Sequence, residues 1–260
     1  MIRSRFIAYV SALAAIGGFT AGAQSVPKTG PEVFQRMHDA YAGKWYRTLT
    51  FVQKTTQRRP DGTDVVSTWY ESLRQVDGVT QLRIDNGDPS AGNGVLYTAD
   101  SSWRMRDGKL VSASAGGNEF LPLIEGDYFN PVDQTIRELS STKTDMSRVI
   151  EGSYQNRRVW IIGAASTADT TSPQIWIDAE RNVAVRAILS PAANMPMLDI
   201  HLDGYVPIDG TWLASKIAMM QGGVPRQTEE YRDWKVNVDL PASLFDVAMW
   251  TTSPHWAKRP

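Results

Sequence analysis

The composition of this 260-residue chain excludes several classes of protein. The chain carries 27 Lys and Arg against 28 Asp and Glu, and this balance argues against nucleic acid as a partner, because phosphate binding requires a basic surface. It has no cysteine, which excludes a disulfide framework and an acylated N-terminal cysteine. Its nine tryptophans favour a β-rich fold or a surface for an apolar ligand.

The N-terminus has the pattern of a secretory signal peptide. Two arginines precede an apolar run over residues 6–19, and the small residues Ala21-Gly22-Ala23 then form a cleavage pattern. A membrane anchor is the alternative, but two glycines interrupt the run and no basic flank follows it. We therefore expect a signal peptide over residues 1–23, a periplasmic location, and a single domain over residues 24–260.

An amphipathic helix is expected soon after the cleavage pattern. Pro31 suits the first turn of this helix and Gly43 suits its end. Between them the apolar residues follow helical spacing and form one stripe: Val33, Phe34, Met37, Ala40 and Tyr41.

After the helix the apolar pattern changes to a period of two, which predicts strands. Asp-Gly at 77–78 and 107–108 separates alternating runs, and this dipeptide is a strong hairpin signal. Residues 118–140 lack the alternation, and Asn130-Pro131 is typical of a helix start, so we expect a short helical insertion there. The alternation then resumes and continues almost to the C-terminus.

The predicted fold class follows from these short connections. About eleven strands joined by hairpins form one antiparallel sheet, and an antiparallel sheet of this size must curl. We therefore expect a mainly β protein with an α lid. It is an unclosed, strongly curved antiparallel β-barrel, covered by the N-terminal helix and the short helical insertion.

The hairpin over residues 174–189 has two apolar faces. Ile175 and Ile177 share one face with alternate residues of the second strand, and the opposite face carries Trp176, Ala184 and Ile188 where polar side chains would be expected. An ordinary core covered by helices is one explanation. A cavity lined for a lipid or another apolar ligand is the other.

The usual signatures of enzymes and metal sites are missing from the sequence. No two of the three histidines have a metal-binding spacing, and no nucleophile elbow or phosphate loop is present. His38-Asp39, the segment 199–203 and Glu229-Glu230 could supply an acid–base pair, but solvated surface is the simpler interpretation. We predict no catalytic residue, no metal and no cofactor.

The order of motifs resembles that of periplasmic lipoprotein-carrier proteins, the LolA/LolB-like superfamily. The segment 33–55 resembles their helix and first strand, and "YESLRQVDGVTQLRID" (70–85) resembles their second and third strands. The hairpin "QIWIDAERNVAVRAIL" (174–189) and the segments 205–217 and 229–246 are similar to their later strands and closing cap. The resemblance covers nearly all of the chain after the signal peptide.

The resemblance implies an open half-barrel that accepts acyl chains beneath a helical lid. We expect the cavity to be lined by Phe51, Trp69, Leu82, Leu96, Trp103, Met105, Trp160 and Trp176. We expect the lid to present Phe34, Met37, Tyr41, Phe120, Leu121, Leu123 and Ile124. The family's strand-loop arginine, which holds the lid closed, has its nearest match in Arg74, although Gln75 stands where the family has proline.

The resemblance also implies partners. They are the acyl chains of lipoproteins or another lipid, together with an inner-membrane release complex and an outer-membrane acceptor. Two alternatives stay open at this point. One is an envelope-stress regulator of the same fold that binds a protein partner, and the other is a periplasmic hydrolase.

Overall fold

The structure is a computed structural model, and it describes residues 25–98, 100–118, 120–190 and 196–257. The predicted signal peptide lies outside the described residues. Within these ranges, no helix combines the length and apolar character needed to cross a membrane.

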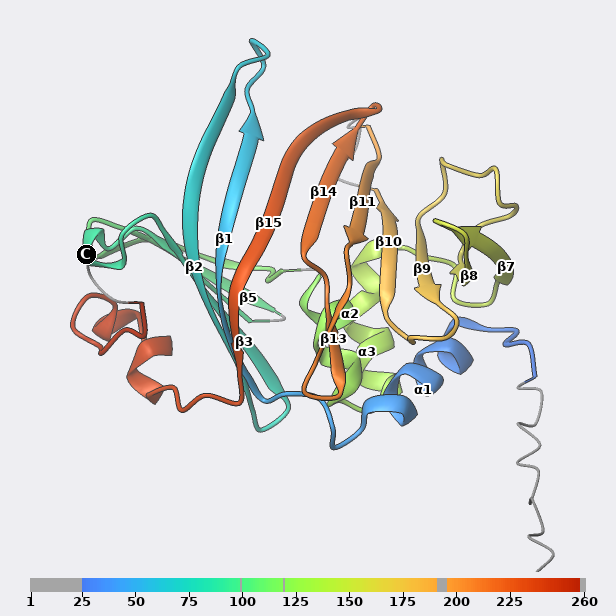
Figure 1. Cartoon of the computed structure of the whole chain (residues 1–260), viewed down its shortest axis with the longest axis horizontal. Helices are drawn as coiled ribbons and strands as arrows, with labels where there is room; N and C mark the ends of the chain where they lie inside the picture. Colours follow the sequence, from blue (N-terminus) through green and yellow to red (C-terminus); the bar gives the residue numbers. More distant parts are fainter. Residues whose placement is uncertain (1–24, 99, 119, 191–195, 258–260) are drawn as a thin grey trace, which may run out of the picture.

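The chain folds into one large antiparallel sheet with short helices in its hollow (Figure 1). The first strands are β1 (Thr48–Arg58), β2 (Asp64–Val76), β3 (Val79–Asn86), β4 (Gly94–Tyr97), β5 (Ser101–Arg106) and β6 (Lys109–Ala115). The later strands are β7 (Val149–Tyr154), β8 (Arg157–Ile162), β9 (Gln174–Asp178), β10 (Ala184–Leu189), β11 (Leu198–Asp203), β12 (Val206–Ile208), β13 (Thr211–Leu213), β14 (Lys216–Gln221) and β15 (Val224–Val236).

The helices are few and short. The α-helices are α1 (Gly30–Tyr41), α2 (Leu121–Ile124) and α3 (Val132–Glu138). The 3₁₀ turns are η1 (Pro89–Ala91), η2 (Gly126–Tyr128), η3 (Leu139–Thr142), η4 (Ala242–Phe245) and η5 (Val247–Met249). Both the N-terminal helix and the helical insertion are therefore present, as the sequence predicts.

Thirteen strands form a single open sheet in the order β6-β5-β4-β3-β2-β1-β15-β14-β11-β10-β9-β8-β7, while β12 and β13 form a separate hairpin. This confirms the predicted fold class, although the predicted number of strands is too low. Two stretches of continuous alternation are each divided into two strands in the structure. The first is interrupted at Gly204, which has a φ of 64°, and the second at residues 214–215. The breaks create the separate hairpin.

The hairpin turns have the backbone conformation that the sequence predicts. Asp77 and Gly78 have φ values of 51° and 76°, and Asp107 and Gly108 have φ values of 49° and 72°. Positive φ at both central residues is the tight turn whose twist matches that of antiparallel strands. Asp and Gly tolerate this left-handed region better than other residues.

The first and last strands of the sheet join its two halves. β1 pairs with β2 along its whole length and with β15 on its other side, with Gln53 opposite both Trp69 and Tyr231. The chain therefore builds the sheet outward from β1 to the edge strand β6. It then returns inward from the other edge strand, β7, to β15.

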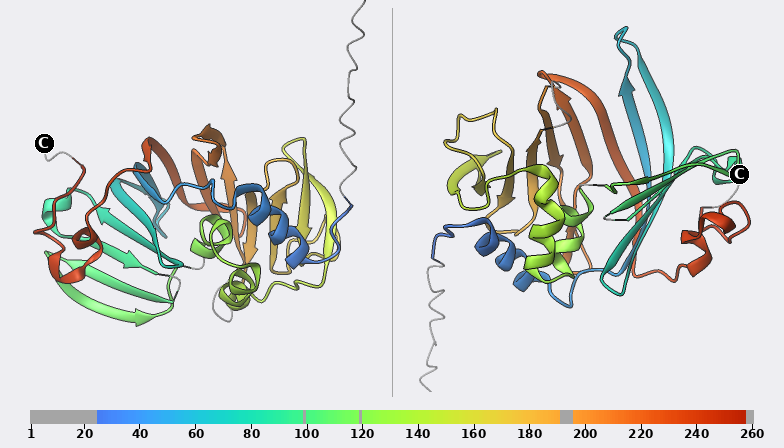
Figure 2. Two further views of the ribbon diagram at one scale, coloured as in Figure 1. Left: turned by 90° about the horizontal axis from the view of Figure 1, so that it is seen from below. Right: turned by 180° about the vertical axis from the view of Figure 1, so that it is seen from behind.

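The inner face of the sheet holds the main core. The apolar stripe of α1 is buried there, as predicted, with Phe34 and Met37 fully inaccessible to solvent. Seen from below, the sheet arches over α1 and the insertion (Figure 2).

A β-bulge changes one prediction for the hairpin β9–β10. Ala184 pairs with Ile177 and Arg186 pairs with Trp176, so the register shifts between Ala184 and Arg186. Paired residues point to the same face of a sheet. Ala184 therefore shares the inner face with Ile177, although the uninterrupted alternation predicts the opposite face.

The outer face of β9 is covered by the chain itself. The segment 163–173 folds back so that the Gln174 side chain donates to the carbonyl oxygens of Asp169 and Ser172 at 2.9 and 3.2 Å. The indole of Trp176 donates to Gln174 at 2.7 Å, and the Arg186 guanidinium lies 4.7 Å from its ring. The second apolar face of the hairpin is therefore ordinary buried structure.

The outer face of β3–β5 is covered by the C-terminal segment 240–257. Arg83 is 1% exposed and donates two hydrogen bonds to Asp85 at 2.7 and 2.8 Å. It also donates to the carbonyl oxygens of Leu244 and Trp250, each at 2.9 Å. Its guanidinium lies 3.8 Å from the Trp250 ring, so one buried cation holds the covering segment at two points.

The helical insertion is anchored by a buried carboxyl group. Glu125, at the end of α2, accepts hydrogen bonds from the Trp45 indole at 3.0 Å and from the Tyr46 hydroxyl at 2.6 Å. Tyr128 stacks on Trp45 with a centroid distance of 3.7 Å. Burial raises the pKa of Glu125 to about 8, and the two hydrogen bonds oppose that shift.

Replacement of Arg83 by Met is expected to destabilise the protein by about 3–5 kcal/mol, because it leaves Asp85 buried without its cation. Urea denaturation measures the loss, and limited proteolysis should show faster cleavage within 240–257. The matched control Arg58→Met removes an exposed ion pair with Asp64 and should cost less than about 1 kcal/mol. The double variant Arg83→Met, Asp85→Asn should recover part of the loss. Equal stability of Arg83→Met and Arg58→Met would contradict the structural role assigned to Arg83.

Replacement of Glu125 by Gln is expected to flatten the pH dependence of stability between pH 5 and pH 8. The folded-state pKa of Glu125 lies above its unfolded value, so the folded wild type loses stability as pH rises through this window. The loss is at most about 1.4 kcal/mol per pH unit. Glutamine resembles the protonated acid and avoids this loss, which urea denaturation at several pH values would detect.

Asp133→Asn is the control for this experiment. Asp133 is an exposed carboxylate of the same insertion, and Arg137 lowers its pKa, so it titrates below the window. Its stability difference from the wild type should stay constant from pH 5 to pH 8. A constant difference for Glu125→Gln as well would show that Glu125 ionises normally in the folded protein.

Candidate functional site

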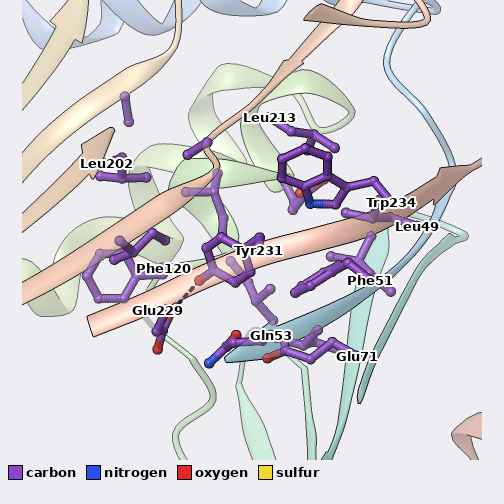
Figure 3. A pocket seen from close by; sticks show the side chains of 18 of the residues that line it. Leu49, Phe51, Gln53, Glu71, Phe120, Leu202, Leu213, Glu229, Tyr231 and Trp234 are labelled. Atoms are coloured by element: carbon purple, nitrogen blue, oxygen red, sulfur yellow. Dashed lines mark hydrogen bonds between the residues drawn. The ribbon is translucent and has the colours of Figure 1, made fainter. Parts of the chain in front are cut away.

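A partly open cavity of about 160 Å³ lies between the inner face of the sheet and the helical insertion. Its sheet wall comes from β1, β2, β3, β11, β14 and β15, and the insertion closes the opposite side. Figure 3 shows Phe51, Leu49 and Trp234 along the strands, with Phe120 facing them from the insertion. Most of the lining is apolar or aromatic.

The structure brings six of the predicted residues together at this cavity. Phe51, Trp69 and Leu82 lie on its sheet wall, and Phe120, Leu121 and Ile124 line it from the insertion. The insertion therefore presents the apolar groups that the sequence analysis assigns to a lid. The alternation of β1 places Leu49, Phe51 and Gln53 on one face, which is the reason that the strand contributes a continuous stretch of wall.

Three of the predicted cavity residues lie on the outer face of the sheet. Leu96 and Met105 are buried in a second core cluster with Leu244, Phe245 and Trp250, and Trp103 packs against it. Leu96 pairs with Arg83, so both side chains point to the same face of the sheet. Arg83 follows the cavity residue Leu82 on β3, so this shared face is the outer one. The prediction that these three side chains point into the cavity is therefore wrong. The C-terminal segment provides a second apolar environment on the outer face, so apolar residues occur on both faces of these strands.

The two remaining tryptophans of the prediction lie at the other end of the sheet. Trp160 is buried beside α1, with Arg36 of that helix 5.8 Å from its ring. Trp176 faces outward, as described above. The structure places neither of them among the residues that line the cavity.

The other predicted lid residues belong to the core. Phe34, Met37, Tyr41 and Leu123 are buried in the main core and do not border the cavity. The helix α1 is therefore part of the core, and of the two predicted lid elements only the insertion borders the cavity.

Arg74 does not reach the insertion. It follows the cavity residue Leu73 on β2, so it points to the outer face of the sheet. There it donates to Gln81 at 2.6 Å, and its guanidinium lies 4.4 Å from the Phe245 ring. The structure thus corrects the predicted latch, because Arg74 contacts the C-terminal segment.

The cavity also contains residues that the sequence analysis did not select. Four aromatic residues, Trp45, Trp212, Tyr231 and Trp234, line it together with three acids, Glu71, Glu125 and Glu229. Tyr231 and Glu229 follow the period of two along β15, and that pattern was a usable signal. Glu125 lies in the insertion, where no strand period exists to place it.

The three acids are all buried, at 4%, 4% and 7% exposure for Glu71, Glu125 and Glu229. Glu229 accepts hydrogen bonds from Tyr231 and Gln227. Burial raises the pKa of Glu229. Burial also raises the pKa of Glu71, and the nearby charges of Glu229 and Asp85 raise it further.

Of the acid–base pairs considered from the sequence, the structure brings together His201 and Asp199 but separates Glu229 from Glu230. Glu229 faces the cavity, whereas Glu230 lies on the surface and pairs with Lys54 at 2.7 Å. On the outer face, His201 contacts Asp199 at 3.2 Å and Tyr154 at 2.9 Å. Among the described residues, no group of His, Cys, Asp and Glu has the arrangement of a metal site.

No family model matches the sequence, and the comparison with curated proteins finds no match. The comparison with solved structures does find similar folds. A DUF1329 family protein from Desulfovibrio piger has a TM-score of 0.60 at 13% identity, covering 84% of this chain and 95% of its own.

Two further structures belong to the same comparison. A domain described provisionally as an outer membrane lipoprotein-sorting protein, from Vibrio parahaemolyticus, has a TM-score of 0.57 at 13% identity, covering 85% of this chain and 98% of its own. A LolA superfamily protein from Nitrosomonas europaea has a TM-score of 0.48 at 12% identity, covering 84% and 97%. The described part of the chain shares its fold with the first two of these structures, and in this chain the fold is an open antiparallel half-barrel with helices in its hollow.

Proposed function

We propose that this chain is an exported periplasmic protein that binds acyl chains or a similar hydrophobic ligand, in lipoprotein sorting or lipid transport. The observation that carries the proposal is the apolar cavity between the open sheet and the insertion. The similarity to the lipoprotein-sorting domain from Vibrio parahaemolyticus supports it at the level of the fold. The signal-peptide pattern of the sequence supports the proposed location.

The size of the cavity bears on how a ligand would enter. A cavity of about 150 Å³ accommodates a ligand the size of benzene, so the 160 Å³ present here holds only part of a long acyl chain. Phe120, Leu121 and Ile124 occupy the side from which the space can grow. We infer that the insertion moves outward when a chain enters.

Burial of the ligand would supply the energy for this movement. Each buried CH₂ group contributes about 0.8 kcal/mol. The apolar contacts of the insertion are lost at the same time, so they compete with the acyl chain and lower the net affinity. A carrier requires such a compromise, because it must release its ligand.

Replacement of Ile217 by Trp is expected to abolish ligand binding, because Ile217 lines the cavity and a larger ring fills it. The neutral probe N-phenyl-1-naphthylamine should become fluorescent with the wild-type protein and raise its melting temperature in a concentration-dependent way. Both signals should disappear in the variant. Ala218→Trp is the matched control, because Ala218 pairs with His201 on the outer face and should leave both signals intact.

Loss of binding in both variants would point to general damage, and binding retained in Ile217→Trp would place the ligand outside this cavity. A wild-type protein that gives neither signal with this probe or with a monoacylglycerol would refute the proposed function.

The export part of the proposal has a separate test. Mass spectrometry of the protein recovered from the periplasm should give a mature N-terminus at Gln24 or within a few residues of it. Periplasmic protein that retains Met1 would contradict cleavage of the signal peptide.

A further inference from the structure

The cavity combines an apolar wall with acidic side chains and, among the described residues, no basic one. Its described lining contains Glu71, Glu125 and Glu229 but no lysine, arginine or histidine. An anion that entered this space would therefore meet acids and no cation. Burial of an anion in an apolar site without a counter-ion carries a large cost in free energy.

Glu71 differs from the other two acids in its hydrogen bonding. Glu125 accepts from Trp45 and Tyr46, and Glu229 accepts from Gln227 and Tyr231. Glu71 is 4% exposed and makes no hydrogen bond to any described residue. Buried polar side chains nearly always have a partner, so an unpartnered carboxyl directed into a cavity points to a ligand group that completes it.

The position of Glu71 on the sheet directs it toward the cavity. Glu71 pairs with Phe51 on one side and with Ile84 on the other, and both of these residues line the cavity. Figure 3 shows its carboxyl group on the inner face, near Gln53. The amide of Gln53 donates to Thr55 at 2.8 Å, so it is engaged within its own strand.

We propose that the cavity selects amphiphiles whose polar end is uncharged or cationic and donates a hydrogen bond to Glu71, and that it excludes amphiphiles with an anionic end. The proposal rests on the proposed function, since it names the class of ligand for the same cavity. An alcohol or an ammonium group satisfies the free carboxyl. A carboxylate or phosphate brings a negative charge into a buried site whose described lining offers no counter-ion.

Displacement of N-phenyl-1-naphthylamine by matched amphiphiles tests this selectivity. Dodecanol, dodecylamine and dodecanoate share one alkyl chain and differ only in the polar end. With the wild-type protein at neutral pH, dodecanol and dodecylamine should displace the probe at concentrations lower by about tenfold or more than dodecanoate, a difference of about 1.4 kcal/mol. This order needs no variant, so it does not depend on the folding of a mutant.

The variant Glu71→Gln assigns the effect to one side chain. It should weaken dodecylamine binding, because an amide cannot pair with an ammonium group as a carboxylate can, so that the preference over dodecanoate falls by about tenfold, while dodecanol changes little. Glu230→Gln is the matched control. It makes the same chemical change as Glu71→Gln, but Glu230 lies at the surface and pairs with Lys54, outside the cavity. It should leave all three affinities unchanged.

The outcomes separate this inference from the proposed function. Dodecanoate that binds the wild type as well as dodecylamine overturns the selectivity, while the cavity remains a lipid site. A preference that persists unchanged in Glu71→Gln overturns the role of Glu71. Failure of the probe and of all three amphiphiles to bind overturns the proposed function itself.

Discussion

The architecture depends on one topological constraint, which is that β6 and β7 follow each other in the chain but form opposite edges of the sheet. The segment 116–148 must therefore cross from one edge to the other. The sheet curves, so the shortest path for this segment runs over its hollow side, where α2 and α3 are found (Figure 2). The cover of the cavity thus follows from the strand order.

A sheet of this kind has two faces to bury, and the chain covers each with different segments. Helices fill the inner face, while the C-terminal segment and residues 163–173 cover opposite ends of the outer face. The buried Arg83 explains how an irregular segment can serve as a cover, because it supplies hydrogen bonds to the free carbonyl oxygens of Leu244 and Trp250. Two separate apolar clusters result.

Those two clusters explain which parts of the structure the sequence could predict. Local signals sufficed for the Asp-Gly turns, the stripe of α1 and the presence of the insertion. A period of two shows that Leu82 and Arg83 point to opposite faces, but it does not show which face borders a cavity. Trp103 and Met105 were therefore assigned to the wrong face, since the cover provided by residues 240–257 has no strand or helix pattern. The bulge at Ala184 could not be read from the alternation either.

The buried acids indicate what distinguishes this cavity from ordinary core. A structural core gains nothing from Glu71, because a buried carboxyl that accepts no hydrogen bond from the protein costs free energy. Glu125 is different, since its two hydrogen bonds join the insertion to the end of the N-terminal region. One acid therefore stabilises the closed state, and the other remains unsatisfied in it. A ligand that donates a hydrogen bond to Glu71 would also displace Phe120 and Ile124, because all three residues line the same cavity. Its apolar contacts would then replace those of the insertion, so binding of the ligand and opening of the insertion are coupled.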